Sequence, residues 1–359
     1  MPADFTYDKW RDDQDIPVHK GYYIEDLRTV DVAPWSLREC NAAFIQLEGM
    51  QGVVEGRVQE IPPGGTLKPF KSAVDEFVYV LSGQGSTSVW GTDSRPHHSF
   101  EWASRSLFVV PRNAWAQHNN MQGDKPVRLL HYNYMPIAMS AVPDPAFWFN
   151  NPYEEDLPHD GATEFYSEAQ CITQEHIPEG RSGRILWLGN FFPDMAVWDK
   201  LIARPVRGAG GQVVFMSAPG TELRAHMSVF AVSTYKKAHR HGPGRIIVIP
   251  AGEGYSIMWP EGKEKVVIPW HEASCFTPPD RWFHQHFNLG NIPGRYLALH
   301  PPAQFSGHAE RVEDHARDQI EYPDEDPWIR EKFESELRAR GLESAMVEEA
   351  YKNRDFKWD

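Results

Sequence analysis

The chain has 359 residues, of which 41% are hydrophobic, and its formal net charge is -14 at pH 7. Much of the acidic excess lies at the two ends of the chain, and the sequence contains no basic cluster of the kind that binds nucleic acid. No apolar run approaches the roughly 20 residues that span a bilayer, and the beginning, MPADFTYDKWRDDQD, is too acidic and polar for a signal peptide. We therefore expect a soluble, cytoplasmic protein with neither a membrane nor a nucleic-acid partner.

Short β-branched runs separated by turn residues predict a mainly β protein. The 29 prolines and 27 glycines are scattered between these runs, which suits many strands joined by tight turns better than long helices. Cys40, Cys171 and Cys275 are odd in number and widely spaced, so neither a disulfide framework nor a cysteine-based zinc site is indicated. We expect buried thiols.

Two parts of the chain repeat one pattern. VYVLSGQGSTSVW (78–90) and IVIPAGEGYSIMW (247–259) each contain an apolar strand, then Gly-x-Gly, then an alternating strand that ends in tryptophan. Further along each part, LFVVPRNAWAQHNN and SCFTPPDRWFHQHFN are alike, with Trp115 placed opposite Trp282. Because short strands at regular spacing are typical of barrels and sandwiches, we expect one β unit that is used twice.

The segments outside the two units have a different character. Residues 140–190 are rich in proline, aromatic and acidic side chains and predict a long connection with local helix at most. After the second unit, PWIREKFESELRARG (327–341) follows a potential N-cap, Asp326, has a proline in its first turn and ends at Gly341. This pattern predicts amphipathic helices that pack against a barrel or a neighbouring subunit.

The second unit carries paired histidines, in HRHGPGRIIVIPAGEG (239–254). Residues i and i+2 of a strand project to the same face, so His239 and His241 can offer imidazole nitrogens to one ion. His284 and His286 alternate in the same way on a second strand. The alternative is that these are core histidines bonded to backbone carbonyls, but two alternating pairs favour a metal site. Other histidines of this unit each stand alone and are expected to be structural: His226, His271 and His300.

This pattern resembles the cupins, small antiparallel jelly-roll barrels that hold a metal in the barrel mouth. The resemblance rests on the order His239-x-His241, Gly252, Pro279, His284 and Asn288. It implies an all-β bicupin of two tandem barrels with a C-terminal helical extension, homo-oligomeric, with His284 as the third ligand. The ending Trp-Phe-His-Gln-His-Phe-Asn most resembles the gentisate and salicylate type of ring-cleaving dioxygenase. The expected parts are an N-terminal barrel without a metal site, a connecting segment, a metal-binding barrel and a helical tail, at 1–150, 151–204, 205–305 and 306–359.

Arg245 stands where many cupins place a glutamate ligand. A three-histidine site leaves the charge of a divalent ion unneutralised and up to three positions open, which differs from the manganese sites of oxalate decarboxylases and germins and favours a chelating anion. If Arg245 faces the cavity, its guanidinium would hold a substrate carboxylate. The turn at 242–244 can reset the alternation, and an outward Arg245 paired with an acid is an equal alternative. Glu253 and Lys237 are expected to be solvated.

The first unit lacks this ligand set. At the positions that correspond to His239, His241, Arg245 and His284, it has Phe70, Ser72, Glu76 and Gln117. His118 is the one imidazole near them in the sequence, and one imidazole with one carboxylate makes a poor metal site. We expect this barrel to be structural.

Together these patterns favour a non-haem Fe(II)-dependent dioxygenase that cleaves a C–C bond of a carboxylate-bearing aromatic or enolisable substrate. The substrate would chelate iron through a hydroxyl or enolate oxygen and an adjacent carboxylate or carbonyl, and O2 would take the remaining position. His286 would accept the substrate hydroxyl proton, and Arg245 would hold the carboxylate. Three aromatic residues are candidates to line the cavity, with a core position as the alternative for each: Tyr255, Trp259 and Trp282.

Two alternatives stay open for the same barrel. With Zn2+, Ni2+ or Mn2+ as a Lewis acid, the site would suit a redox-neutral decarboxylase, lyase or hydrolase. A non-catalytic bicupin would hold a ligand in the barrel and dock a partner on its acidic helices. The expected partners of the enzyme are a small organic acid and O2.

Overall fold

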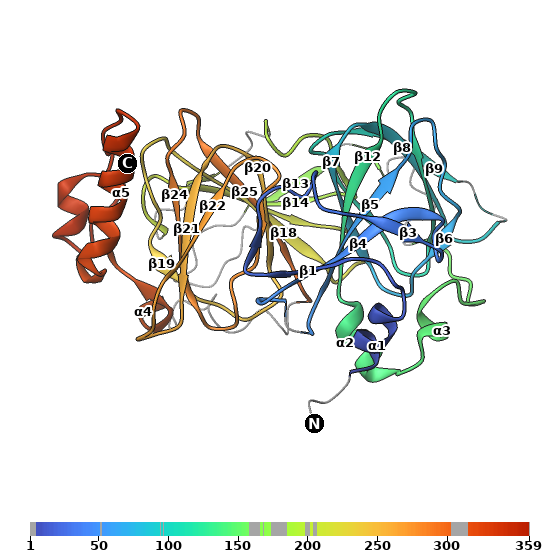
Figure 1. Ribbon diagram of the computed structural model, residues 1–359. Coiled ribbons are helices and arrows are strands. Elements are labelled where there is room, and N and C mark those ends of the chain that lie inside the picture. The colour runs from blue at the N-terminus through green and yellow to red at the C-terminus, as the bar shows by residue number, and fades with distance from the viewer. Residues whose placement is uncertain are drawn as a thin grey trace.

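The computed structural model describes residues 5–358, apart from residues 51, 94, 96, 158–165, 168, 174–184, 198–201, 204–206 and 303–314. Two β barrels lie side by side, and C-terminal helices lie against the outer end of the second one (Figure 1). Three short helices, α1 (Thr6–Asp12), α2 (Met135–Ala141) and α3 (Pro145–Trp148), lie beside the first barrel. The predicted all-β fold with two tandem barrels and a C-terminal helical extension is confirmed.

The first barrel consists of a large and a small sheet. The large sheet has the order β1-β4-β5-β12-β7-β10-β15, with β3 beside β4, and the small sheet has the order β6-β11-β8-β9. The strands are β1 (Val18–Gly21), β3 (Ala33–Trp35), β4 (Cys40–Leu47), β5 (Glu55–Ile61), β6 (Phe70–Lys71), β7 (Glu76–Ser82), β8 (Gln84–Trp90), β9 (His98–Ala103), β10 (Leu107–Val110), β11 (Trp115–Asn120), β12 (Val127–Asn133) and β15 (Phe191–Phe192).

The second barrel repeats this plan. Its large sheet has the order β13-β14-β17-β18-β25-β20-β23-β2, with β16 beside β17, and its small sheet has the order β22-β21-β24-β19-β26. The strands are β2 (Tyr23–Ile24), β13 (Gln170–Thr173), β14 (Ile185–Leu188), β16 (Ile202–Ala203), β17 (Gln212–Ser217), β18 (Arg224–Phe230), β19 (Ala238–His239), β20 (Ile246–Ala251), β21 (Gly254–Trp259), β22 (Val266–Trp270), β23 (Cys275–Phe276), β24 (Phe283–Asn288), β25 (Gly294–His300) and β26 (Gln319–Ile320).

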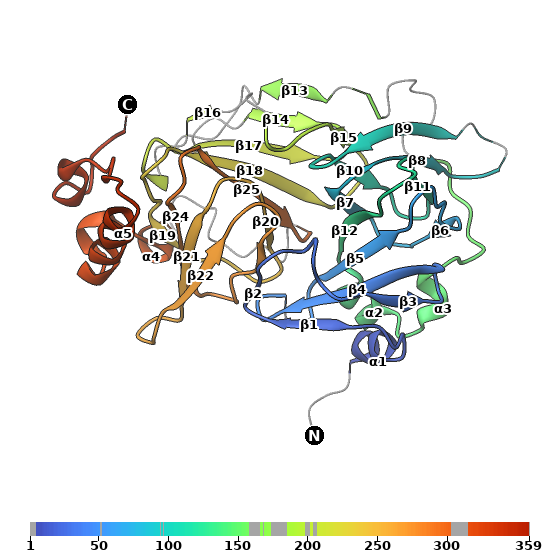
Figure 2. The same cartoon turned by 45° about the horizontal axis from the view of Figure 1, so that its top comes forward.

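The two barrels exchange short strands at their edges. β2, from the beginning of the chain, pairs with β23 of the second barrel, while β15 pairs with β10 of the first. Figure 2 shows this crossing of early and late segments. The connection predicted to contain local helix at most is corrected here, because β13 and β14 add to the edge of the second large sheet, where β14 runs parallel to β17. Such edge strands satisfy backbone groups that a sheet edge leaves unpaired.

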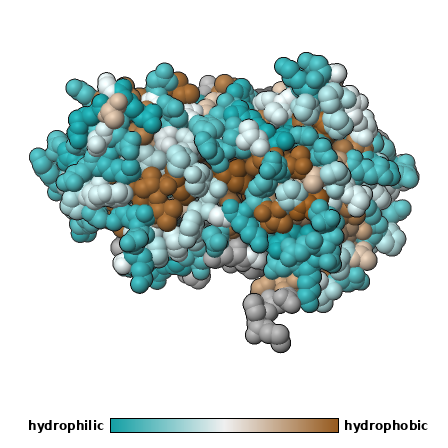
Figure 3. All heavy atoms as spheres, viewed as in Figure 1, coloured by the Kyte–Doolittle hydropathy of each residue, from teal (hydrophilic) through white to brown (hydrophobic). Residues whose placement is uncertain are grey.

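An apolar core joins the two large sheets face to face. It takes alternate residues of strands from both barrels, among them Val58, Tyr79 and Leu130 from the first and Val214, Met227 and Leu297 from the second. Inward-facing residues of the first barrel form a second cluster. Hydrophobic residues on the face seen in Figure 3 gather over the middle of the molecule, between more hydrophilic ends.

The strand register corrects one correspondence between the units. In the first barrel His118 pairs with Thr87, and in the second His286 pairs with Ser256. His118 therefore corresponds to His286, and the counterpart of His284 is Ala116 rather than Gln117. The tryptophan alignment shifted this segment by one residue, and in a strand a shift of one residue changes which face a side chain occupies.

The tail contains the predicted helix. α5 (Pro327–Ala339) begins after Asp326, whose side chain accepts a hydrogen bond from the Trp328 N–H, and Gly341 follows with φ +70°. Its apolar face is buried on the small sheet of the second barrel and contributes Ile329 and Phe333 to the cluster there. A 3-10 turn (Glu348–Tyr351) completes the tail, and α4 (His315–Asp318) leads into β26, which pairs with β19.

Two sequence expectations concern other features. Cys40 and Cys275 are buried free thiols, as predicted, and the Cys171 side chain lies outside the described residues. Within the described parts of the chain, none of the helices has the length and apolar character that a membrane span requires.

Candidate metal centre

Two neighbouring strands carry the three predicted ligands. β19 pairs with β24, and the register places His239 directly opposite His284. The chain continues from β19 to His241, two residues on, and the Arg281 N–H donates to the His241 carbonyl at 3.0 Å. Pairing with β24 and this loop contact fix the positions from which the imidazoles project.

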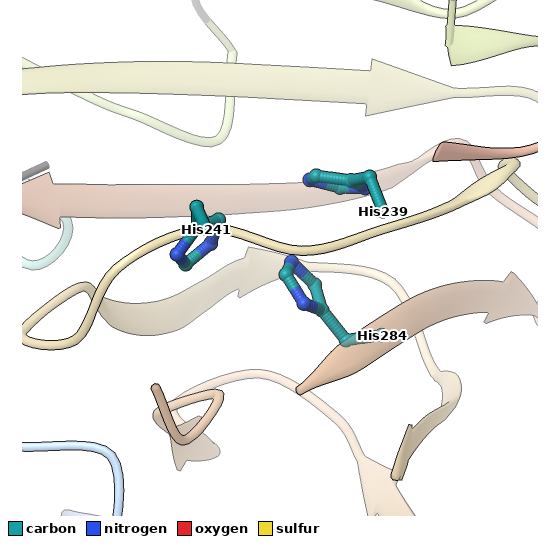
Figure 4. A group of neighbouring side chains, drawn as sticks. All are labelled: His239, His241 and His284. Carbon is teal, nitrogen blue, oxygen red and sulfur yellow. The ribbon is translucent and has the colours of Figure 1, made fainter. Parts of the chain in front are cut away.

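The three imidazoles converge. One potential ligand atom from each ring lies within 4.8 Å of those of the other two. The His284 ring centroid is 4.3 Å from that of His239 and 4.6 Å from that of His241. Figure 4 shows His239 and His241 on one segment and His284 facing them from β24. Within the described residues, this is the one group of three such donors, and it contains no carboxylate.

Backbone carbonyls orient two of the rings. His241 Nδ1 lies 2.7 Å from the Gly242 carbonyl, and His284 Nδ1 lies 3.3 Å from the Trp282 carbonyl. Because a carbonyl only accepts, each Nδ1 carries the proton, and each Nε2 keeps a lone pair. This arrangement is typical of ligand histidines. His239 Nδ1 is buried without a hydrogen-bond partner in the described chain, so this ring has an unused nitrogen.

The environment keeps these imidazoles neutral. Burial lowers the pKa of His284 to about 3. Burial also lowers the pKa of His239 and His241 well below the usual range, with further lowering from the Arg207 charge at His239 and the Arg245 charge at His241. Neutral imidazoles are the form that binds a cation. The donor set, with its unsatisfied nitrogen, therefore fits a divalent metal ion.

Cationic side chains line a cavity that His239 borders. Arg245 is 5% exposed and lines the cavity together with His239, Arg207 and Lys236. The inward orientation of Arg245, one of two equal alternatives from the sequence, is therefore the one found. It follows that the cavity presents positive charge beside the three histidines.

His286 lies behind the ligands. It is 1% exposed, and its ring centroid is 5.6 Å from that of His284 on the same face of β24. Its Nδ1 is 2.8 Å from Ser256 Oγ, which also accepts a hydrogen bond from Trp270 Nε1 at 3.1 Å. His286 is thus held in a fixed orientation inside the barrel.

The three aromatic candidates for the cavity wall lie elsewhere. Tyr255 and Trp259 project from the outer face of β21 into the cluster beneath α5, where Tyr255 stacks on Phe287 with 4.5 Å between centroids. Trp282 packs beside Tyr22 at 5.6 Å. The reason is the tail: because α5 covers the outer face, both faces of β21 are buried, and alternation alone does not reveal which faces the cavity.

Several cavity residues were missed or misassigned from the sequence. His226 and His300 do not stand alone: His226 Nδ1 is 2.6 Å from His300 Nε2, across the pairing of β18 with β25, and His226 lines the cavity. Lys236 also lines it and donates to Ser228 Oγ. Lys237, expected to be solvated, is buried and forms an ion pair with Glu321 of the tail. The Lys-Lys pair preceding the ligand strand was the available signal.

An acidic residue of the tail, Asp318, forms hydrogen bonds with arginines next to the three histidines. Asp318 is 2% exposed and accepts hydrogen bonds from Arg240 Nε at 3.0 Å and Arg281 Nη2 at 2.6 Å. Arg240 lies between the two ligands of β19 and the following loop. Burial alone would raise the pKa of Asp318, but hydrogen bonds from arginines lower it below its usual range, so this carboxylate stays ionised.

Comparisons with known proteins concern the fold alone. No family model and no curated protein match the sequence. Among solved structures, an oxalate decarboxylase from Bacillus subtilis, studied for its Mn(II) centres, is similar at 10% identity and a TM-score of 0.49, covering 84% of each chain. A salicylate 1,2-dioxygenase from Pseudoaminobacter salicylatoxidans, in adducts with gentisate, is similar at 12% identity and a TM-score of 0.48, covering 69% of this chain and 68% of that one.

Proposed function

We propose that this chain is a metal-dependent oxygenase: a non-haem Fe(II) dioxygenase that cleaves a C–C bond of a small organic acid, aromatic or enolisable. The observation that supports this most is the set of three converging neutral imidazoles without a carboxylate, next to a cavity lined by arginine and lysine. Fe(II) bound there would supply open coordination positions for a chelating substrate and O2. The metal ligands would be His239, His241 and His284.

We assign to Arg245 the binding of the substrate carboxylate. A guanidinium about 6 Å from a carboxylate attracts it by roughly 2–3 kcal/mol at an effective dielectric of 20, before desolvation is counted. Arg207 and Lys236 line the same cavity, so an anion there meets several cations. The two-pronged geometry of a guanidinium also orients a carboxylate, which an ammonium does less well.

We assign to His286 the role of the base that accepts the proton of the substrate hydroxyl. Ser256 Oγ has two lone pairs and can accept from both Trp270 Nε1 and His286 Nδ1. In that tautomer His286 Nε2 has a free lone pair on the inner face of β24. Burial keeps the pKa of His286 well below its usual range, so the ring is in the neutral form that a general base requires. The same burial makes it a weak base, so it would take the proton only from a substrate hydroxyl that a bound metal makes acidic.

Oxygen consumption tests the proposal. The Fe(II)-loaded protein would be screened in an oxygen electrode with hydroxybenzoates and β-keto acids, with ring or chain cleavage followed by product mass. We expect stoichiometric O2 uptake, loss of turnover in His284→Ala, and a raised KM in Arg245→Gln. His271→Ala is the matched control, because His271 lies in the same barrel but outside the ligand group.

Two outcomes would overturn the oxygenase. Turnover that proceeds equally well without O2, with Zn2+, Ni2+ or Mn2+ in place of iron, would assign the same residues to a redox-neutral reaction. Undiminished ligand affinity in metal-free protein would instead indicate a non-catalytic binding barrel.

A further inference from the structure

The first barrel contains two buried arginines at its centre. Arg57 projects inward from β5 and is 1% exposed, and Arg38, from the turn before β4, is 2% exposed. The Arg38 guanidinium lies over the Phe70 ring, 4.6 Å from its centroid, and Arg57 lies over the Trp35 ring at 5.0 Å. Buried guanidinium groups are costly unless an anion compensates them.

Two buried glutamates of this barrel are already engaged with Arg57. Arg57 pairs with Glu55 through Nη1 and with Glu76 through Nη2, the latter at 3.0 Å. Glu76 also contacts His131 Nδ1 at 2.6 Å and accepts from Asn133 Nδ2 at 2.9 Å. Both oxygens of Glu76 therefore have partners. Arg38 forms no ion pair in the described part of the chain, and burial lowers its pKa to about 10.

Several buried polar atoms of the first barrel lack a hydrogen-bond partner in the described chain. These atoms are buried and have no hydrogen-bond partner in the described chain: Arg38 Nε and Nη2, Arg57 Nε, the Gln59 amide, His118 Nε2 and His131 Nε2. The ring centroids of His118 and His131 are 5.6 Å apart. Burial lowers the pKa of both rings, and the Arg38 charge lowers it further. Buried polar groups in proteins are nearly always paired, so these atoms offer donors and acceptors to a polar ligand.

The strand register shows which residues of the first barrel stand at the positions of His239 and His284. Phe70 and Ala116 pair with each other as His239 and His284 do in the second barrel. An alanine methyl stands where the second barrel has an imidazole, and the Arg38 guanidinium lies over the facing Phe70 ring. The position that carries metal ligands in one barrel is therefore lined with guanidinium N–H groups in the other.

We propose that the first barrel binds a small carboxylate anion between Arg38 and Arg57, against Phe70 and Ala116. The Arg38, Arg57 and Gln59 N–H groups would donate to the carboxylate. His131, whose Nδ1–H faces Glu76, presents Nε2 as an acceptor, and Gln59 Oε1 is a second acceptor, so a hydroxyl next to the carboxylate suits the site. This inference does not rest on the proposed function, because it uses no residue of the metal centre.

Thermal unfolding with added malonate tests the site, with chloride and sulfate at equal ionic strength as reference anions. We expect malonate to raise the Tm of the full chain more than the reference anions do, and Arg38→Met to weaken the apparent affinity for malonate at least tenfold. Without added carboxylate, the same substitution should raise the Tm, because it removes a buried charge that lacks a partner. The matched control is Arg338→Met, since Arg338 is 67% exposed and far along α5.

A second variant tests the site without changing the charge of the barrel. Ala116→Leu enlarges the side chain that faces Phe70 and leaves every polar group in place, so it should also abolish the malonate shift. The proposal is overturned if malonate and sulfate stabilise the protein equally, or if Arg38→Met and Ala116→Leu respond to malonate as the parent does. Metal content should be unchanged in both variants, which separates this site from the metal centre.

Discussion

Ala116 and His284 occupy the same position in the two barrels. Ala116 pairs with Phe70, and His284 pairs with His239, in equivalent antiparallel contacts. The two barrels thus share a backbone plan and differ in the side chains directed into it. One presents three imidazoles, while the other presents a methyl group and a phenyl ring, with guanidinium groups above them.

The metal content of the purified protein should depend on His239, His241 and His284. Protein purified without added metal should contain about one equivalent, and His284→Ala should lose it while His271→Ala keeps it, as elemental analysis would show. Because an ion that binds only the folded state stabilises it by about 2.7 kcal/mol at a hundredfold excess over Kd, chelation should lower the Tm of the parent and of His271→Ala. Retained stoichiometric metal in His284→Ala would exclude this ligand set.

The stability of the metal-free protein should fall as the pH drops below about 6.5, in part because of His118. Burial, with the Arg38 charge, lowers the folded-state pKa of His118 well below its usual range, so the unfolded chain binds a proton that the folded chain does not. The stabilisation is present above the unfolded pKa and is lost towards acid. His118→Gln should reduce the slope of unfolding free energy against pH by up to about 1.4 kcal/mol per unit, measured by denaturant titration. An unchanged slope, equal to that of His271→Gln, would show that the pKa of His118 is not lowered in the folded state.

Removing the Tyr255 hydroxyl should not impair the metal centre. Tyr255 Oη is buried without a partner in the described chain, and its ring stacks on Phe287 beneath α5. An unsatisfied buried polar group costs about 1–3 kcal/mol, so Tyr255→Phe should raise the Tm and leave metal affinity and KM unchanged. A raised KM with an unchanged Tm would place Tyr255 at the cavity, as the sequence suggested.

The sequence predicted the two barrels and the group of three histidines because these depend on local patterns. Gly-x-Gly turns and the His-x-His alternation of His239 and His241 each lie within a few residues of chain, and the spacing around His284 added the third imidazole. The direction in which Tyr255 faces depends on a helix more than 70 residues later in the chain, and alternation is uninformative once both faces of a strand are covered.

Long-range pairing hid the remaining features. The sequence gives no sign that Lys237 meets Glu321, or that β2 crosses to the second barrel, because such contacts arise only when the sheets assemble. Arg38 and His131 do not stand at positions that correspond to the three histidines, so the repeat between the two units gives no sign of them. The shared segment Gln-His-x-Asn at His118 and Gln-His-Phe-Asn at His286 would have corrected the alignment by one residue.

Glu325 should make the tail sensitive to pH in the opposite direction from His118. Burial raises its pKa to about 7, although Tyr235 Oη and Gln285 Nε2 donate hydrogen bonds to it. Because the folded pKa lies above the unfolded value of about 4.3, this carboxyl stabilises the fold at low pH, and the contribution is lost as the pH rises towards 7. Glu325→Gln should therefore raise the Tm at pH about 8 more than at pH about 5. The exposed Glu343→Gln is the control, and equal changes at both pH values in Glu325→Gln would contradict the shift.

Asp318 should support metal binding from outside the barrel. Its carboxylate accepts hydrogen bonds from Arg240 and Arg281. Arg240 lies between His239 and His241 in the chain, and the backbone N–H of Arg281 donates to the His241 carbonyl. Asp318→Asn would remove the one buried anion from this cluster, leave its arginines to repel one another, and loosen the segment from which His239 and His241 project. Residues that orient ligands typically change metal affinity by 10–100-fold, so we expect Asp318→Asn to weaken Zn2+ binding by that order in chelator competition. Glu261→Gln provides the matched control, because Glu261 also pairs with Arg240 but is 75% exposed, and exposed pairs contribute little. Equal affinities in the two variants would show that β26 docks on β19 without holding the ligands in place.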